Sequence, residues 1–82
     1  MAIQVALASF TGADPLDGGY PYVDVVYPVA YVNPTDYVAF PGLQATAPLS
    51  FWIKDGSQTT TGCRVQAIDQ VVATLAVVLV DT

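Results

Sequence analysis

The run from Val71 to Val80 constrains the fold of this chain most, because nine of its ten residues are apolar and five of them are valine. Valine is stiff at χ1 and has a low helix propensity, and the run lacks a good helix cap, so a strand is favoured over a helix. Side chains alternate between the two faces of a strand, and apolar residues occupy odd and even positions here, so both faces are predicted to be buried. In a chain of 82 residues only one face of a strand can meet the core. The other face is therefore expected to meet a partner.

Two earlier segments also carry a period of two. From Ile3 to Phe10, larger aliphatic residues on one face alternate with small or polar residues, which is typical of a half-buried strand. From Tyr22 to Val32 the odd positions are apolar or aromatic, while Pro28 interrupts the other face. Proline has no N–H to donate, so an edge strand or a strand broken near Tyr27 is expected.

Turn residues separate the predicted strands. A loop of ten residues is expected from Thr11 to Tyr20, where Asp14-Pro15 and Asp17-Gly18-Gly19 interrupt any periodicity. The tetrapeptide Asn33-Pro34-Thr35-Asp36 predicts a type I turn with proline at its second position. A short strand is predicted from Tyr37 to Phe40, ended by a type II turn at Pro41-Gly42.

Parity predicts the register of the next hairpin. The apolar residues that share a face on each side of the turn are all odd-numbered: Leu49, Phe51 and Ile53, then Cys63, Val65 and Ala67. A two-residue loop at Asp55-Gly56 would put these two sets on opposite faces of the sheet. A three-residue loop, Lys54-Asp55-Gly56 with Gly56 left-handed in a G1 bulge, reunites them. The predicted pairs are then Phe51 with Thr59 and Leu49 with Thr61, with Trp52 on the reverse face.

No internal repeat, heptad or linker divides the chain. Several short strands with short connections predict one all-β domain over residues 1–82, built as a small antiparallel β-sandwich or β-barrel of about six to seven strands.

Charged residues are scarce. The chain has seven Asp, Lys54 and Arg64, no Glu and no His, which makes 11% charged residues and a net charge of −5. A typical soluble domain is about 25% charged. With 54% apolar and aromatic residues, the free monomer is expected to expose much apolar surface. That surface predicts either aggregation or coverage by other copies or a different partner, and we favour coverage; the alternative is that Thr, Tyr and Gln wet a β-surface without charge.

The same composition argues against catalysis and metal binding. Without His the usual general base is missing, so no enzymatic activity is expected. Cys63 lies in an alternating apolar run and is interpreted as a buried free thiol. Asp14, Asp17 and Asp24 lack the spacing of a dedicated calcium loop, and one Cys without His is too little for zinc. No metal or other cofactor is predicted.

Nucleic acids and membranes are not expected partners. Only two cations are available to neutralise phosphates, so the counterion-release contribution to binding is nearly missing. The longest apolar run is ten residues, half of the roughly 20 that a membrane-spanning helix requires. No basic residue lies between Met1 and Phe10, so no secretory signal peptide is expected.

Aromatic residues with polar tips supply the remaining candidates, because they suit core packing, protein interfaces or sugar stacking. Together with the last strand they give the predicted partner-contact residues, which are Tyr22, Tyr27, Tyr31, Trp52, Val72, Val78 and Val80. No catalytic residue is predicted.

In its size, its β-rich composition with Asp and Thr, and its Met1 start, the chain resembles small accessory proteins of tailed-bacteriophage virions, such as capsid decoration or cement proteins. The resemblance implies a non-enzymatic structural subunit of the virion, assembled in the host cytoplasm. It would clamp neighbouring subunits of the major capsid protein or another shell protein, as a homo-oligomer, a dimer or a trimer. The alternative is a small β-sandwich that binds a ligand or carbohydrate in a groove near Trp52 and the region from Tyr20 to Tyr37.

Overall fold

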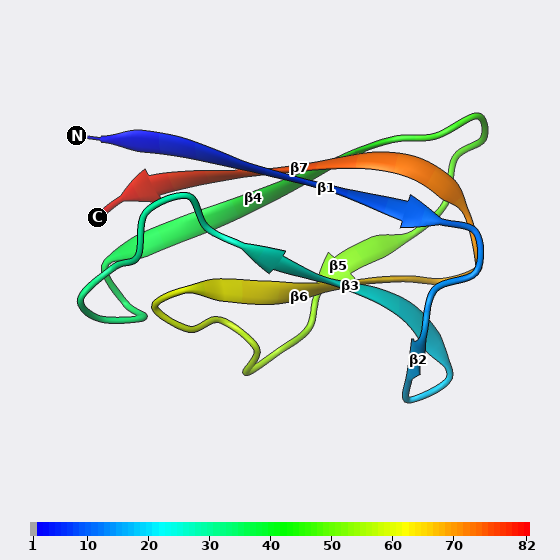
Figure 1. The fold of residues 1–82 in the computed structure, drawn as a ribbon, viewed down its shortest axis with the longest axis horizontal. Coiled ribbons are helices and arrows are strands. Elements are labelled where there is room, and N and C mark those ends of the chain that lie inside the picture. Colours follow the sequence, from blue (N-terminus) through cyan, green and yellow to red (C-terminus); the bar gives the residue numbers. More distant parts are fainter. Residues whose placement is uncertain (1) are drawn as a thin grey trace.

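Seven strands form two antiparallel sheets that pack face to face in the computed structural model, which describes residues 2–82 (Figure 1). The first sheet has the order β1-β7-β4 and contains β1 (Ile3–Thr11), β7 (Val72–Asp81) and β4 (Tyr37–Gln44). The second has the order β2-β3-β6-β5 and contains β2 (Leu16–Asp17), β3 (Tyr20–Val26), β6 (Gly62–Ala67) and β5 (Phe51–Ile53). The all-β prediction is confirmed, and of its two forms the sandwich is the one present.

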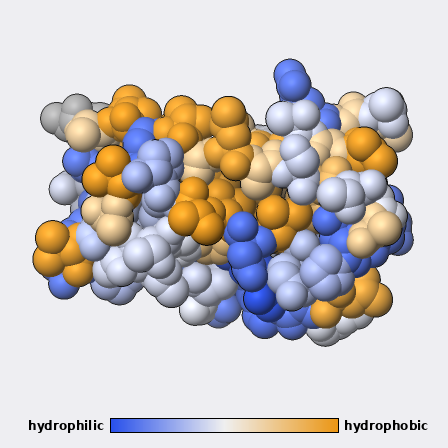
Figure 2. Space-filling view, viewed as in Figure 1, coloured by the Kyte–Doolittle hydropathy of each residue, from blue (hydrophilic) through white to orange (hydrophobic). Residues whose placement is uncertain are grey.

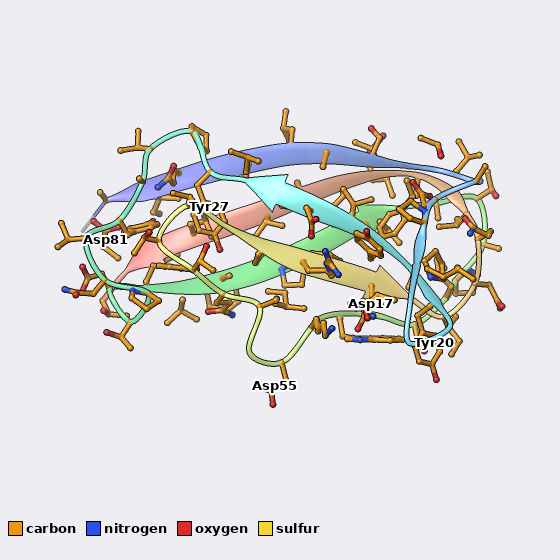
Figure 3. The ribbon with its side chains drawn as sticks, turned by 60° about the horizontal axis from the view of Figure 1, so that its bottom comes forward. Asp17, Tyr20, Tyr27, Asp55 and Asp81 are labelled. Atoms are coloured by element: carbon orange, nitrogen blue, oxygen red, sulfur yellow. The ribbon has the colours of Figure 1, made fainter. Side chains whose placement is uncertain are left out.

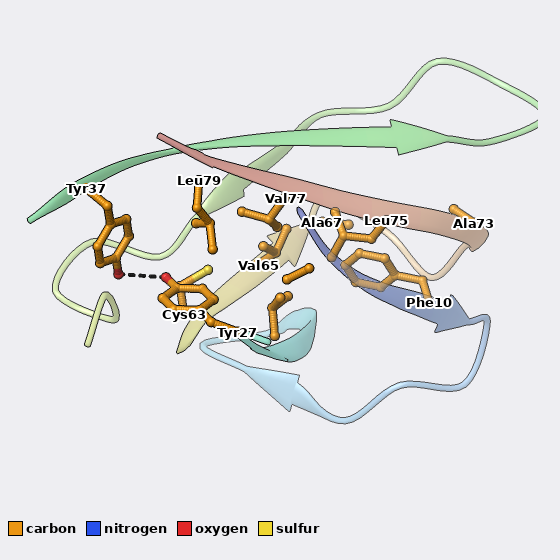
Figure 4. Packing of buried hydrophobic residues seen from close by; sticks show 12 residues of the cluster. Phe10, Tyr27, Tyr37, Cys63, Val65, Ala67, Ala73, Leu75, Val77 and Leu79 are labelled. Atoms are coloured by element: carbon orange, nitrogen blue, oxygen red, sulfur yellow. Dashed lines mark hydrogen bonds between the residues drawn. The ribbon is translucent and has the colours of Figure 1, made fainter. Parts of the chain in front are cut away.

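The core lies between the two sheets (Figure 4). It is made of every second residue along the long strands, and its fully buried members include Phe10, Val25, Val65, Leu75, Val77 and Leu79. Burial of this apolar area, at about 25 cal/mol per Å², is the main source of stability. The strand β7 lies in the middle of its sheet, so its odd-numbered side chains from Ala73 to Leu79 form the centre of the core.

The strand β1 turns its even-numbered side chains towards the core. Ala6 and Phe10 are buried, while Ile3, Val5 and Leu7 are exposed. The half-buried pattern is therefore present, but the larger aliphatic side chains lie on the outside of the sheet. The inner side of β1 contributes Ala6, Ala8 and Phe10 to the core cluster.

The predicted turn at Pro41-Gly42 is wrong. The strand β4 continues through both residues to Gln44, with Pro41 opposite Val77 and Gly42 opposite Ala76. Proline is accepted here because β4 is at the edge of its sheet and pairs with β7 alone. The preceding turn is confirmed, since the Asp36 amide donates to the Asn33 carbonyl at 3.1 Å.

The strand β3 ends at Val26, in agreement with a break near Tyr27, and the following segment up to Pro34 is irregular. The loop predicted from Thr11 to Tyr20 contains the short strand β2, which pairs with the start of β3.

The predicted parity of the β5–β6 hairpin is correct, but its predicted register is wrong. Phe51 lies opposite Ala67 and Ile53 opposite Val65, so the two apolar sets share one face, eight residues further along than expected. The turn at Lys54 is present, because the Ser57 amide donates to the Lys54 carbonyl and Gly56 has a φ of 76°. The chain does not pair with β5 directly after this turn. Residues 57–61 form a loop first, and β6 begins at Gly62. Pairing the large apolar residues with Ala67 and Val65 buries more apolar surface than pairing them with threonines would.

Two glutamine side chains hold the long loops against the sheets. The Gln4 amide donates to the Val29 carbonyl at 2.9 Å and accepts from the Val29 amide at 3.0 Å. The Gln70 side chain makes the same two bonds to the backbone of Asp14, both at 2.9 Å. Each side-chain amide thus satisfies a loop peptide as a neighbouring strand would.

Candidate functional site

The outer side of the sheet β1-β7-β4 is an apolar surface that no element among residues 2–82 covers. Three cross-strand rows form it, and we call these nine residues the apolar face: Ile3–Val80–Val38, Val5–Val78–Phe40 and Leu7–Ala76–Gly42. Because all three strands are in register, these side chains form a continuous patch. Figure 2 shows apolar residues gathered along much of the upper side of the molecule, where Figure 1 places β1 and β7.

The side chains at the two edges of the apolar face are the most exposed. Leu7 is 74% exposed, Ile3 63% and Phe40 55%, and each could bury most of its surface only against another molecule. Val78 and Val80, on the central strand, are half-buried by these neighbours. Single exposed apolar residues are ordinary, but a contiguous patch of this kind marks a contact surface.

The apolar face carries no charge. The next row along the strands, Ser9–Thr74–Gln44, is polar and also uncharged. None of the seven Asp residues and neither Lys54 nor Arg64 belongs to the apolar face, and Asp81 borders it by following Val80 at the end of β7.

Gly42 contributes no side chain to the apolar face, and we call this gap the hollow; nothing within residues 2–82 requires a glycine there. Its φ is not in the left-handed region, and an added Cβ would meet only the Ala76 carbonyl oxygen at 3.8 Å, an ordinary contact. At Gly62, by contrast, a Cβ would collide with the Val25 carbonyl oxygen. Glycine inside a strand lowers stability by roughly 0.5–1 kcal/mol, and it often marks a place where another group approaches the backbone closely.

The outer side of the second sheet is, by contrast, hydrophilic. Arg64 binds both carboxylate oxygens of Asp24, at 2.7 and 3.0 Å, and also Asp17 at 2.8 Å. Lys54 binds the same Asp17 oxygen at 2.6 Å. Hydrogen bonds from Lys54 and Arg64 lower the pKa of Asp17, and those from Arg64 lower the pKa of Asp24. Both cations of the chain are thus used on this side, which faces the reader in Figure 3 with Asp17 and Tyr20 at one end.

The aromatic side chains on the hydrophilic side already contact other side chains of the same chain. Trp52 lies on the reverse face, as predicted, and its indole N–H donates to Gln66 at 2.9 Å. Tyr20 meets the Trp52 ring edge-on, with the ring centroids 5.1 Å apart. The Arg64 guanidinium lies over the Tyr22 ring, 3.8 Å from its centroid.

Three tyrosines lie together at one end of the core, and Figure 4 shows two of them, Tyr27 and Tyr37. Tyr37 donates its hydroxyl proton to the Thr59 carbonyl at 2.8 Å, so the 2.6 Å bond between Tyr27 and Tyr37 has Tyr27 as its donor. The Tyr31 ring stacks on Tyr37 at 4.4 Å between centroids. Burial raises the pKa of Tyr27 and of the nearby Cys63 thiol, which keeps both groups neutral and the thiol unreactive.

The structure distributes the seven predicted contact residues over three regions. Val72, Val78 and Val80 lie on the outer side of β7, Tyr22 and Trp52 lie on the hydrophilic side, and Tyr27 and Tyr31 point into the core end. Sequence reasoning missed the contributions of β1 and β4. The sequence signal for β1 was the alternation of large apolar residues from Ile3 to Leu7. It had to be considered together with β7, whose odd-numbered residues already supply a core.

Asp14, considered above for calcium, is engaged in a turn, where it accepts from the Thr11 amide at 3.0 Å. Among residues 2–82, no three His, Cys, Asp or Glu side chains come together in a way that could hold a metal ion. The same residues contain no helix long and apolar enough to cross a bilayer.

Comparisons with protein-family models, with curated proteins and with solved structures give no match.

Proposed function

We propose that this chain is a non-enzymatic structural subunit of a larger protein assembly, in which the apolar face is covered by another chain. The observation that carries the proposal is that face itself: nine uncharged residues in register on three strands, with the largest side chains mostly exposed. In water this patch costs free energy at about 25 cal/mol per Å², which a partner surface would recover.

The contrast between the two sides of the sandwich supports the same proposal. The hydrophilic side keeps its ion pairs and hydrogen bonds within the chain, so it can remain in water while the opposite side is covered. The most specific form of the proposal is a decoration protein on a virion shell, in line with the resemblance in size and composition.

Absence of catalysis belongs to the same proposal. The sequence has no His, two of its Asp residues are held by cations, and burial raises the pKa of its single thiol. These conditions leave few groups able to act as an acid, base or nucleophile near neutral pH.

The alternative, carbohydrate binding around Trp52, is less well supported. A stacking platform needs a free ring and free polar groups, whereas the Trp52 N–H is bonded to Gln66 and Arg64 covers the Tyr22 ring. Glycan-array binding that disappears in Trp52→Ala would favour this alternative.

The direct test is density-gradient fractionation of the native source, with the tagged wild-type chain compared with Val78→Lys. We expect the wild type to sediment with particles containing a shell protein, and Val78→Lys to remain near the top of the gradient. Gln58→Lys, an exposed position off the apolar face, is the matched control and should sediment like the wild type. A wild-type chain found only at the top, or Val78→Lys sedimenting with the particles, would contradict the proposal.

A further inference from the structure

We propose that the apolar face is covered by the same face of a second copy, in a two-fold dimer that closes at two chains. This inference deepens the proposed function and rests on it, since the second copy is then the chain that covers the apolar face in the assembly.

The lack of charge on the apolar face favours a second copy over a charged partner. A surface selected for a basic or acidic partner carries complementary charges, which set specificity and association rate. None is present on the apolar face or on the Ser9–Thr74–Gln44 row. A lipid surface is also disfavoured, because interfacial elements use Lys and Arg near the headgroups, and this chain has a net charge of −5. A second copy presents the same uncharged apolar face, so the two contacting surfaces have the same polarity.

The size of the face fits a modest dimer. Three strands about 4.8 Å apart, each with three residues of the face about 6.8 Å apart along the strand, outline roughly 300 Å² before side-chain relief is counted. Stable interfaces bury about 800 Å² of accessible surface per partner, and smaller ones are weak or transient. We therefore expect a dissociation constant in the micromolar range, on the order of 1–100 µM.

The hollow at Gly42 gives the two faces a shape that can fit. A two-fold axis lying in the interface along β7 would place Leu7 of each copy over Gly42 of the other. An axis lying across the strands between Val78 and Ala76 would place Phe40 there instead. Either arrangement puts a large exposed side chain into the hollow, and this accounts for a glycine that nothing within residues 2–82 requires.

The other surfaces explain why association should stop at two. Stacking a third copy on the hydrophilic side would desolvate Asp17, Asp24 and their cations, which is unfavourable. At the free edge of β4, Pro41 interrupts the row of backbone donors that another strand would need. An isologous pair uses up the apolar face on both copies.

Sedimentation equilibrium over about 5–500 µM tests the proposal, with Gly42→Val as the decisive variant. We expect the wild type to shift from a mass of 8.6 kDa to twice that value, and Gly42→Val to weaken the dimer at least tenfold. Gln58→Val, which adds the same apolar side chain off the face, should dimerise like the wild type. Because valine fits the strand at position 42, the thermal midpoint of the Gly42→Val monomer should be equal or higher.

Non-specific stickiness predicts the opposite sign, because Gly42→Val adds apolar surface. Stronger or unchanged association of Gly42→Val would therefore overturn the inference, as would a wild type that aggregates without a defined dimer. A wild type that stays monomeric, or that binds neutral phosphatidylcholine vesicles as a monomer, would also overturn it. A monomer that still sediments with native particles would contradict this inference and leave the proposed function intact. A dimer that is absent from every particle would contradict the proposed function and leave this inference intact.

Discussion

Three buried tyrosine hydroxyls differ in their hydrogen bonding, and they belong to Tyr27, Tyr31 and Tyr37. Tyr27 donates to Tyr37, and Tyr37 donates to the Thr59 carbonyl, so this chain of bonds ties the loop before β6 to the core. The Tyr31 hydroxyl is buried and finds no partner within residues 2–82. A buried polar group is costly when unpaired and nearly neutral when paired.

Substitution by phenylalanine should separate these cases. Tyr37→Phe leaves the Thr59 carbonyl and the Tyr27 hydroxyl unsatisfied, and we expect it to lower the free energy of unfolding by about 1–3 kcal/mol. Tyr31→Phe removes a hydroxyl that makes no bond, so stability should stay equal or rise. Urea unfolding followed by Trp52 fluorescence measures both, and equal losses would show that the hydrogen-bond assignment is wrong.

The ion pairs on the hydrophilic side predict acid sensitivity. Asp17 and Asp24 have a pKa lowered by hydrogen bonds from Lys54 and Arg64, whereas carboxyls of the unfolded chain titrate near about 4. Because the folded-state pKa is the lower one, the stabilisation is complete above the unfolded value and is lost as pH falls through the folded one. The urea concentration at the unfolding midpoint should therefore decrease when the pH drops below about 4.

The double variant Asp17→Asn/Asp24→Asn should show a smaller fall of the urea midpoint with pH than the wild type. Asp55→Asn, at an exposed hairpin position for which residues 2–82 offer no ion pair, should keep the wild-type profile. An identical pH profile for wild type and double variant would exclude this origin of acid sensitivity.

At the scale of elements, β7 has one face for the core and one for the outside. Val77 is fully buried, whereas its neighbour Val78 lies on the apolar face. Val77→Thr puts a hydroxyl of nearly the same volume into the core and should cost about 1–3 kcal/mol. Val78→Thr should change the stability of the monomer by no more than about 0.5 kcal/mol. Chemical unfolding at low micromolar concentration compares them, and similar costs would contradict the assigned faces.

Strand positions could be predicted from the sequence better than strand partners. Period-two patterns identified β1 and the parity of the β5–β6 hairpin, and the valine content of the apolar run identified β7, because alternation and composition are local properties. The register of β5 on β6 depends on a loop held by Tyr37 and Tyr31 from another part of the chain, which no local pattern reveals. Pro41-Gly42 resembles a turn locally, and only its place at a sheet edge makes a strand possible.

The candidate site was half predictable for the same reason. The doubly apolar run of β7 indicated a partner surface, and Val78 and Val80 do lie on the outer side of the sheet. That β1 and β4 complete this surface depends on their pairing with β7, and Tyr27 proved to be a core residue.

At the scale of the whole molecule, one side is apolar and uncharged, and the other is hydrophilic. Two copies joined through their apolar faces would repel each other only through their net charges of −5. Salt screens that repulsion without breaking any ion pair in the interface. The dimer should therefore tighten several-fold between about 20 and 300 mM NaCl in sedimentation experiments. Weakening with salt would indicate a different, ion-paired contact surface.

Accessibility of methyl groups to a soluble paramagnetic probe tests most directly whether the apolar face is covered. At several hundred micromolar, NMR signals of the Val5, Leu7 and Val78 methyls should be protected, while those of Val32, 86% exposed on a loop, should be broadened. On dilution towards the monomer, the protection of the first three should disappear. Methyl groups of Val5, Leu7 and Val78 that broaden in proportion to their exposure in the single chain at every concentration would contradict the account.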